Sequence, residues 1–367
     1  MNIYDDDRIV MTLDAGGTNF VFSALQGGEE ITDPIALPSY ADDRERSLKT
    51  IIEGLHKVQS TLNKSPTAIS FAFPGPADYP GGIINNINNL PAYKGGVPLG
   101  PMLEEQFGLP TFINNDGDLF AYGEAMAGIL PEINRRLADK NIPKRYDNLF
   151  GVTVGTGFGG GMVIDNELAL GDNSASAEIW ISRNFDDTRF IAEEGVSIRA
   201  IQHNYWQNAP DCRENLSPRD IYEIACGDRE GDQQAAMGAF EKMGTALGEA
   251  LANAITLIDG IMVIGGGISG AHDLFLPNVI EQLNSTIETR DGTKLPRLVS
   301  HVYNLEDPTS SDAFYDIESK ELPIPFSDKT VPFIPEKRLA VGLSRLGTSK
   351  ATALGAYAFA LDQLQAK

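Results

Sequence analysis

Apolar residues in the first third of the chain alternate between strand-like runs and helical spacing. Residues 9–25 hold two apolar, β-branched runs around a short segment of glycine and small polar residues, which predicts a β-hairpin. Over 42–63 the apolar positions repeat at the spacing of an amphipathic helix. The same reasoning predicts strands over 67–73 and 109–113 and helices over 101–108 and 119–130.

The second part of the chain begins with another hairpin pattern, over 150–164. The pattern that follows predicts helices over 196–206, 232–259 and 348–364 and strands over 261–264 and 339–343. The first domain is expected to end before a basic, exposed linker at 134–146. Residues 304–332 are polar and proline-rich, which indicates a surface insertion.

The glycine-centred hairpin therefore occurs twice, and residues 12–17 align with residues 153–158. Backbone N–H groups in such tips form anion-binding concavities, so two related halves could hold a polyphosphate from both sides. The alternative for each hairpin is a tight turn with nothing bound. The second tip also matches the dinucleotide fingerprint G-x-G-x-x-G, but a strand follows it where that site needs a helix, which argues against a Rossmann site.

Composition and charge narrow the function classes. The 367 residues carry a formal net charge of −22, which would repel nucleic acid and anionic membranes. No apolar run approaches 18 residues, and the acidic N-terminus does not resemble a signal peptide. The two cysteines, Cys212 and Cys226, form neither a disulfide framework nor a zinc motif. We expect a two-domain cytoplasmic protein that binds an anionic ligand only at a locally neutralised site, for example one with Mg²⁺.

Polar and glycine residues follow several predicted strands, at the edge where open α/β sheets bind ligands. Gly75 lies between two prolines after 67–73, and the amide-rich segment 85–91 contains Asn89. Those amides would cap turns or hydrogen-bond a polyol. Asp116 and Asp118 precede a helix, where aspartate usually caps, although a catalytic carboxylate also fits that junction. Residues 265–267 are three glycines after a buried strand, which would be a bare turn or a surface for a flat ring or phosphate.

Taken in order, these motifs resemble the ROK family (repressor, open reading frame, kinase), the sugar kinases with an actin/hexokinase-like fold. The resemblance runs along nearly the whole chain. It is carried by the segments 13–18, 74–76, 89–91, 115–116, 155–161 and 265–267. It implies a two-lobed, duplicated α/β fold of the ribonuclease H-like type with a cleft between lobes, and ATP-dependent phosphorylation of a hexose hydroxyl.

The resemblance also implies roles for individual residues. Asp116 matches the general base, and Asp14 would orient Mg²⁺ or its waters. The positions that line the sugar are Gly75, Asn89, Asn115, Glu178 and Glu193, with Glu194 an alternative to Glu193. The nucleotide would be held by Gly16, Gly17, Thr18, Gly155, Thr156, Gly157, Gly266 and Gly267.

The chain departs from the family pattern after Glu178. Trp180 and Ile181 stand where relatives carry Gly and His, and no cysteine cluster follows, so no structural zinc is expected. Asn19 ends the first loop where Lys is frequent. These departures motivate a second hypothesis, a non-catalytic sugar-binding or regulatory protein that retains the kinase fold.

Domain organisation and partners follow from the same resemblance. The N-terminal lobe is expected over 1–118, with the terminal helix 349–367 packing back on it, and the C-terminal lobe over 119–348. A homodimer is expected, with sugar and ATP as small-molecule partners. A DNA-binding repressor of this family is not expected, because the kinase-like body begins almost at residue 1 and the charge is unfavourable.

Overall fold

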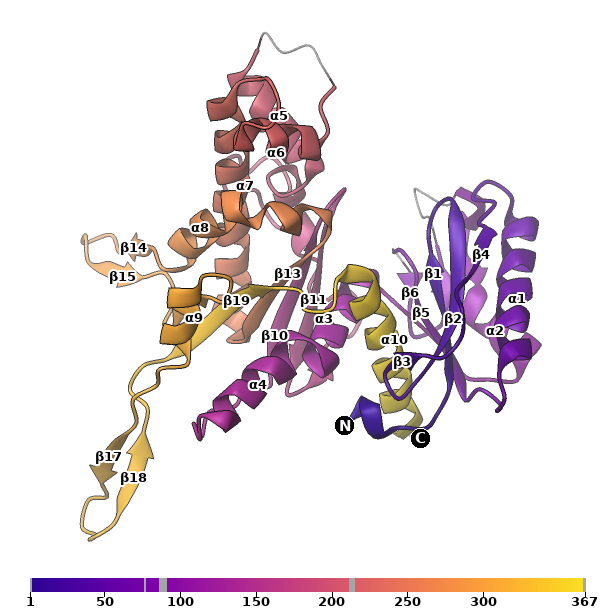
Figure 1. Ribbon diagram of the computed structural model, residues 1–367, viewed down its shortest axis with the longest axis horizontal. Coiled ribbons are helices and arrows are strands. Elements are labelled where there is room, and N and C mark those ends of the chain that lie inside the picture. The colour runs from indigo at the N-terminus through magenta and orange to yellow at the C-terminus, as the bar shows by residue number, and fades with distance from the viewer. Residues whose placement is uncertain (1, 76, 86–90, 211–214, 366–367) are drawn as a thin grey trace. The chain divides into compact units, whose positions relative to one another are not determined.

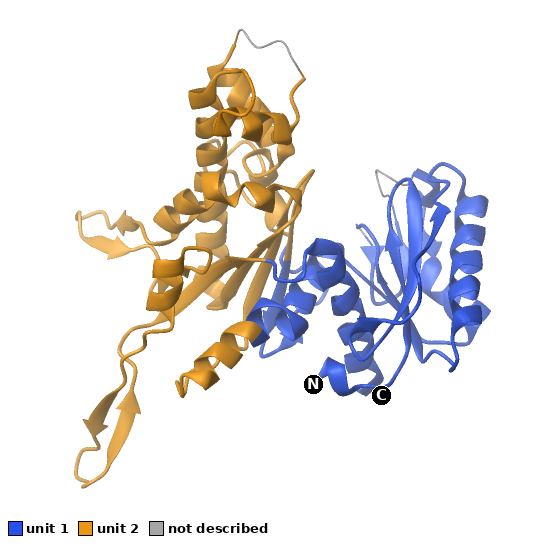
Figure 2. Ribbon diagram, in the orientation of Figure 1, with its two compact units in different colours: residues 1–131, 161–177, 344–367 blue, residues 132–160, 178–343 orange. Residues whose placement is uncertain are grey.

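The computed structural model describes residues 2–75, 77–85, 91–210 and 215–365 (Figure 1). The chain forms two compact units (Figure 2). Unit 1 comprises residues 1–131, 161–177 and 344–367, and unit 2 comprises residues 132–160 and 178–343. Each unit is therefore made of separate segments of the chain. The sequence predicted a domain boundary at 118, but helix α3 (Asp116–Ala127) belongs to unit 1 as a whole.

The sheet of unit 1 has the strand order β3-β2-β1-β5-β9, with β4 pairing to β2. Its strands are β1 (Val10–Ala15), β2 (Asn19–Gln26), β3 (Glu29–Glu30), β4 (Ile35–Pro38), β5 (Ala68–Ala72) and β9 (Thr111–Asn114). The predicted hairpin is confirmed as β1–β2, antiparallel, while β1, β5 and β9 run parallel. The carboxyl ends of the parallel strands therefore meet at one edge.

Helices cover both faces of this sheet (Figure 1). They are α1 (Arg44–Thr61), α2 (Leu99–Phe107), α3 and α10 (Thr348–Gln365). Phe22 packs on α1, so closely that a Cβ at Gly54 would overlap its ring. Phe112 points to the opposite face and meets Phe359 of α10 edge-on. A small sheet of β6 (Ala77–Asp78), β7 (Ile83–Ile84) and β8 (Val97–Pro98) adjoins these layers.

Helices α3 and α10 cross with their backbones in contact. A Cβ at Gly355 would lie 2.7 Å from the carbonyl carbon of Leu119, and one at Gly123 would lie 2.7 Å from that of Ala351. Only glycine permits this approach. The C-terminal helix is thereby fixed to α3, which carries Asp116 as its first residue.

Unit 2 is built on a sheet with the order β11-β10-β13-β19-β16. These strands are β10 (Leu149–Val154), β11 (Phe158–Ile164), β13 (Ile261–Gly265), β19 (Arg338–Leu343) and β16 (His301–Asn304), and β12 (Glu167–Leu168) pairs with the end of β11. The second predicted hairpin is thus confirmed, and the chain passes from unit 2 into unit 1 within β11.

Among the helices of unit 2, α7 (Gln233–Ile258) begins at its cap Asp232 and ends at Asp259, as the sequence predicted. The others are α4 (Ile129–Asp139, beginning in unit 1), α5 (Ile198–Asn208), α6 (Pro218–Cys226), α8 (His272–Leu283) and α9 (Pro308–Phe314). The prediction of an exposed linker over 134–146 was wrong for its first part, because α4 continues to Asp139 and buries Leu137. Residues 140–145 lie outside any helix or strand and are mostly exposed, as expected.

The segment predicted as a surface insertion divides into two parts. Its first part forms α9, which buries Phe314 against Tyr303 of β16. Its second part contains the two-stranded hairpin β17 (Lys320–Pro323) and β18 (Thr330–Phe333), whose residues are all exposed. A second small hairpin, β14 (Thr286–Glu288) and β15 (Lys294–Pro296), precedes β16. Among the described residues, no helix has the length and hydropathy needed to cross a membrane.

Candidate active site

The tip of the β1–β2 hairpin is a compact turn with an open outer surface. A Cβ at Gly16 would lie 2.7 Å from the carbonyl oxygen of Asn19, so the turn needs glycine there. The buried Ser39 fixes the tip, because its hydroxyl donates to the Gly17 carbonyl at 2.6 Å and its N–H donates to the Thr18 carbonyl at 3.0 Å. Gly17 and Thr18 remain exposed and available to a ligand.

The tip of the β10–β11 hairpin is fixed in unit 2 by a carboxylate. The Gly155 N–H donates to the Gly157 carbonyl at 2.9 Å, which closes the turn and leaves Thr156 exposed. Glu193 accepts the Phe158 N–H at 3.0 Å, and a Cβ at Gly157 would lie 2.8 Å from the same carboxylate oxygen. The Glu193 carboxylate therefore orients this hairpin.

Arg199 of α5 strengthens that arrangement. Its guanidinium lies 2.8 Å from the Glu193 carboxylate and 3.0 Å from that of Glu194. The Glu193 side chain is less exposed than that of Glu194, 19% against 45%, which agrees with its contact to the hairpin.

The glycines after β13 lie beside the second hairpin. Gly266 has φ 92°, and a Cβ there would lie 2.6 Å from the Val154 nitrogen, so glycine is required both for conformation and for space. The space beside Gly267 is open, because a Cβ there would meet nothing within 4 Å. Gly267 also lies next to the second tip, because its nitrogen is 4.0 Å from the point where a Cβ of Gly155 would stand. An open backbone surface thus adjoins the second tip.

Asp116 is the first residue of α3, directly after β9. The helix is capped by Asn115, whose side chain accepts the Gly117 N–H at 2.8 Å, and Asp116 accepts the same N–H at 2.9 Å. Asn115 is therefore the N-cap, and the Asp116 carboxylate accepts only the Gly117 N–H among the hydrogen bonds described above, so its other lone pairs can contact a ligand. Asp118 is buried within the first turn.

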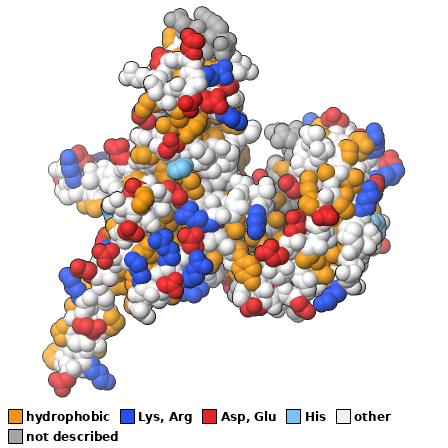
Figure 3. Space-filling view, viewed as in Figure 1, with side chains coloured by type: hydrophobic (Ala, Val, Ile, Leu, Met, Phe, Trp, Pro, Cys, Tyr) orange, Lys and Arg blue, Asp and Glu red, His pale blue; other side chains and the backbone are white. Residues whose placement is uncertain are grey.

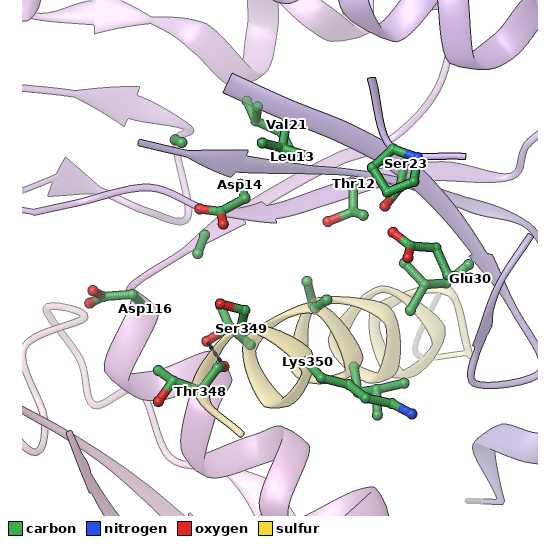
Figure 4. A pocket seen from close by; sticks show the side chains of 18 of the residues that line it. Thr12, Leu13, Asp14, Val21, Ser23, Glu30, Asp116, Thr348, Ser349 and Lys350 are labelled. Carbon is green, nitrogen blue, oxygen red and sulfur yellow. Dashed lines mark hydrogen bonds between the residues drawn. The ribbon is translucent and has the colours of Figure 1, made fainter. Parts of the chain in front are cut away.

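Asp116 and Asp14 line one cavity of about 580 Å³ in unit 1, between the β1–β2 side of the sheet and α10. Figure 4 shows the two carboxylates on the same side of this space, near the first turn of α10 with Thr348 and Ser349. The polar groups of the lining include Thr12 and Ser23, which are cross-strand partners on β1 and β2. This volume is in the range of small-molecule sites.

The surroundings of Asp116 raise the pKa of its carboxyl group. Loss of solvation by the surrounding protein atoms is the main cause, and the charge of Asp14 adds to it, whereas the hydrogen bond from Gly117 opposes the shift. The side chain itself remains accessible from the cavity. A carboxylate with a raised pKa is a stronger base, which suits proton abstraction.

Asp14 offers the donor type that Mg²⁺ prefers. Its carboxylate is exposed at the end of β1 and shares the cavity with hydroxyl oxygens of neighbouring residues. Mg²⁺ in nucleotide sites is held by one or two carboxylates together with waters and substrate phosphates. The Asp14 carboxylate therefore fits a magnesium ion that arrives with a nucleotide.

Gly75 and Asn115 meet next to the buried hydroxyl of Tyr79. The Asn115 amide donates to that hydroxyl at 3.4 Å, and a Cβ at Gly75 would lie 2.9 Å from it. Tyr79 in turn donates to the Phe73 carbonyl at 3.1 Å, which ties the loop after β5 to the sheet. Asn89, also expected near the sugar, lies outside the described residues.

Glu178 directly precedes the short 3-10 helix Ile179–Ile181, and Glu193 lies within the neighbouring one, Ala192–Glu194. The Trp180 indole N–H donates to the Glu178 carboxylate. Trp180, which stands where the family pattern has Gly, therefore holds the Glu178 side chain directly. Within the described part of the chain, no group of three or more His, Cys, Asp or Glu side chains is arranged to bind a metal ion.

Sequence reasoning missed several residues that support the site. Ser39, Tyr79 and Arg199 anchor the two hairpins and the Gly75 loop. Ser39 lies 22 residues from Gly17, whereas Tyr79 and Arg199 each contact a partner six residues away, in irregular segments that no periodic pattern marks. Glu124 is another: this fully buried carboxylate accepts hydrogen bonds from the Ile129 N–H at 2.9 Å and from the Leu346 N–H at 3.1 Å. It thereby joins the end of α3 to the segment that leads into α10.

Comparison with known proteins identifies the family. The ROK family model matches residues 10–304, and the chain belongs to the ROK family. The crystal structure of a glucokinase from Parabacteroides distasonis is 50% identical, with a TM-score of 0.91 over 99% of both chains. An N-acetyl-D-glucosamine kinase of Vibrio cholerae is 26% identical over 83% of this chain and 98% of its own.

A more distant structure shares the fold. It is a ROK family glucokinase from Streptomyces griseus in complex with glucose and AMPPNP, 18% identical, with a TM-score of 0.58 over 95% of this chain and 98% of that one. The fold is therefore the actin/hexokinase-like fold of ROK sugar kinases, as the sequence predicted.

Proposed function

We propose that this protein is an ATP-dependent sugar kinase that phosphorylates a hydroxyl of a hexose or a related sugar. The observation that carries the proposal is the placement of Asp116 and Asp14 in one small-molecule cavity, at the carboxyl ends of β9 and β1. The 50% sequence identity to a glucokinase from Parabacteroides distasonis supports the proposal.

Asp116 is the proposed general base. The sugar hydroxyl oxygen would attack the γ-phosphorus of ATP, forming the new O–P bond while the bond to the ADP oxygen breaks. The hydroxyl proton would pass to the Asp116 carboxylate, which the Gly117 N–H holds in place at 2.9 Å. Magnesium bound with the nucleotide would neutralise phosphate charge.

The two hairpin tips are the proposed phosphate cradle. The exposed tip residues Gly17, Thr18 and Thr156 would contact the phosphates, since phosphoryl transfer depends mainly on alignment and charge stabilisation. The proposed nucleotide contacts lie at residues 16–18 and 155–157, with Gly266 and Gly267 on the adenosine side. The proposed sugar contacts are Gly75, Asn89, Asn115, Glu178 and Glu193.

A coupled ADP-release assay with Mg-ATP tests the proposal against a panel of hexoses and N-acetylhexosamines, without added zinc. We expect turnover that requires a sugar, with glucose and N-acetylglucosamine as the first substrates to compare. If folded protein that binds ATP turns over no sugar in the panel, the kinase proposal fails and a sugar-binding regulatory role replaces it. Sugar binding measured by calorimetry would then identify the ligand.

Trp180→Phe tests whether the indole substitutes for the missing family contact. Loss of the N–H donor would free the Glu178 carboxylate, and we expect KM for the sugar to rise about 5- to 20-fold with KM for ATP unchanged, since one hydrogen bond to a charged group is worth about 1.5 kcal/mol or more. Ile181→Val, at an exposed neighbouring position, is the control. Equal KM values for wild type and Trp180→Phe would remove Trp180 from the sugar site.

Gly267→Val tests the adenosine-side surface. Because a Cβ at this position meets nothing within 4 Å, the free protein should keep its melting temperature. A nucleotide lying against the backbone would be displaced, so we expect KM for ATP to rise at least about tenfold, which corresponds to about 1.4 kcal/mol. Gly270→Val, equally open in the structure, is the matched control and should leave KM for ATP unchanged. The same KM in both variants would place the nucleotide elsewhere.

A further inference from the structure

The hairpin β17–β18 projects from the body of unit 2, and no helix or sheet in the described part of unit 2 covers it (Figure 1). We call residues 320–333 the arm. Every residue from 318 to 333 is exposed. An isolated two-stranded hairpin is marginally stable in water, because it lacks a core to bury. An ordered arm of this kind therefore needs a surface to pack against.

One face of the arm is apolar. The register pairs Leu322 with Val331 and Lys320 with Phe333, so these side chains share a face. The adjacent pairs, Pro323 with Thr330 and Glu321 with Pro332, point the other way. Leu322, Val331 and Phe333 are 41%, 47% and 44% exposed, and orange side chains follow the arm in Figure 3.

The arm is also electrically neutral in a strongly acidic chain. Two lysines (320 and 329) balance two acidic residues (321 and 328), whereas the whole chain carries −22. Two copies of this chain repel each other over most of their surfaces, and the arm is a place where they can approach without that repulsion. Charge and hydropathy therefore favour a second copy of the chain as the partner.

We propose that the arms of two copies pack face to face, through Leu322, Val331 and Phe333, to form a homodimer. Strand addition at the arm's edges is disfavoured, because Pro323 and Pro332 remove backbone donors. With Ile324 and Phe326, the apolar side chains offer roughly 500 Å² per chain, so two arms approach the roughly 1,000 Å² that specific interfaces need. The proposal is independent of the proposed reaction.

An antiparallel arrangement of the arms keeps the two acidic bodies apart, at opposite ends of the pair. It also brings the tip of each arm to the base of the other, as two-fold symmetry requires. The tip carries Phe326, which is fully exposed and has φ 63°. The base holds a cavity of about 220 Å³, in which Tyr146, Ile317, Ile334 and Leu339 lie beside the charged residues Lys144, Asp259, Glu336, Lys337 and Arg338, so that an aromatic ring could meet both apolar side chains and cations. Phe326 of one copy is the proposed occupant of this cavity in the other.

Two neighbouring substitutions test the proposal at equal charge. Val331→Glu places a carboxylate on the apolar face, and Thr330→Glu places one on the opposite face. Light scattering at about 10 μM should give twice 39.7 kDa for the wild type and for Thr330→Glu. Val331→Glu should give the monomer mass, with at least about 100-fold weaker association, and Phe326→Ser should weaken association about tenfold.

Circular dichroism and kinase activity verify folding, since the arm lies outside the proposed catalytic machinery. A wild-type monomer would overturn both the arm proposal and the expectation of a homodimer. A dimer that persists equally in Val331→Glu and Thr330→Glu would overturn the arm proposal alone and assign the dimer to another surface. Neither result would bear on the proposed kinase reaction.

Discussion

Asp116→Asn is expected to lower kcat by about 10²–10⁴-fold, because asparagine keeps the size of the side chain but cannot accept the sugar proton. The substitution should leave the fold intact, since Asn115 caps α3 and the amide oxygen can still accept the Gly117 N–H. The measurement is steady-state turnover in the coupled assay with the preferred sugar. Calorimetric binding of sugar and nucleotide should stay within a few-fold of wild type. Turnover within about tenfold of wild type would remove the role of base from Asp116.

The pH profile gives a second test of the same residue. A base must be deprotonated to act, so the rate should fall as pH decreases through the pKa of Asp116, which lies above the usual range for aspartate. Because the charge of Asp14 contributes to that rise, Asp14→Asn should move the acidic limb to lower pH while also weakening Mg-ATP binding. An acidic limb that stays in place in Asp14→Asn would mean that another group controls it.

Gly355→Ala is expected to have the largest effect on stability. Its Cβ would lie 2.7 Å from the Leu119 carbonyl carbon and 3.0 Å from the Gly123 nitrogen, both backbone atoms that cannot rotate away. Helices α3 and α10 would have to separate, and overpacking of this kind costs about 3 kcal/mol. The measurement is the free energy of unfolding by urea denaturation. The loss would also be expected to reduce turnover, because α3 carries Asp116.

Gly238→Ala is the matched control for that experiment. Gly238 lies inside α7 and a Cβ there would meet nothing within 4 Å. Alanine in a helix interior is favoured over glycine by about 0.5–1 kcal/mol, so this variant should be slightly more stable than wild type. An unfolding free energy for Gly355→Ala equal to that of wild type would show that the two helices are not in backbone contact in solution.

The long, strongly periodic elements could be predicted from the sequence with their correct type. The β1–β2 hairpin and α7 are set by local patterns, namely alternating β-branched runs around glycine and a helical stripe between two aspartates. Where tertiary contacts decide the outcome, prediction failed. The region from 134 was expected as a linker, yet α4 forms because Ile133 and Leu137 find a buried surface.

The candidate site divides in the same way. The residue types and their order along the chain, with the resemblance to the ROK family, were enough to propose Asp116, Asp14 and the two glycine tips as the site. How these groups are held depends on tertiary contacts. Ser39 fixes one tip, Glu193 with Arg199 fixes the other, and Gly123 and Gly355 let α10 approach the helix of Asp116. Apart from the Glu193–Arg199 pair, which spans six residues, these contacts join residues far apart in the chain, and local sequence patterns carry no information about such pairings.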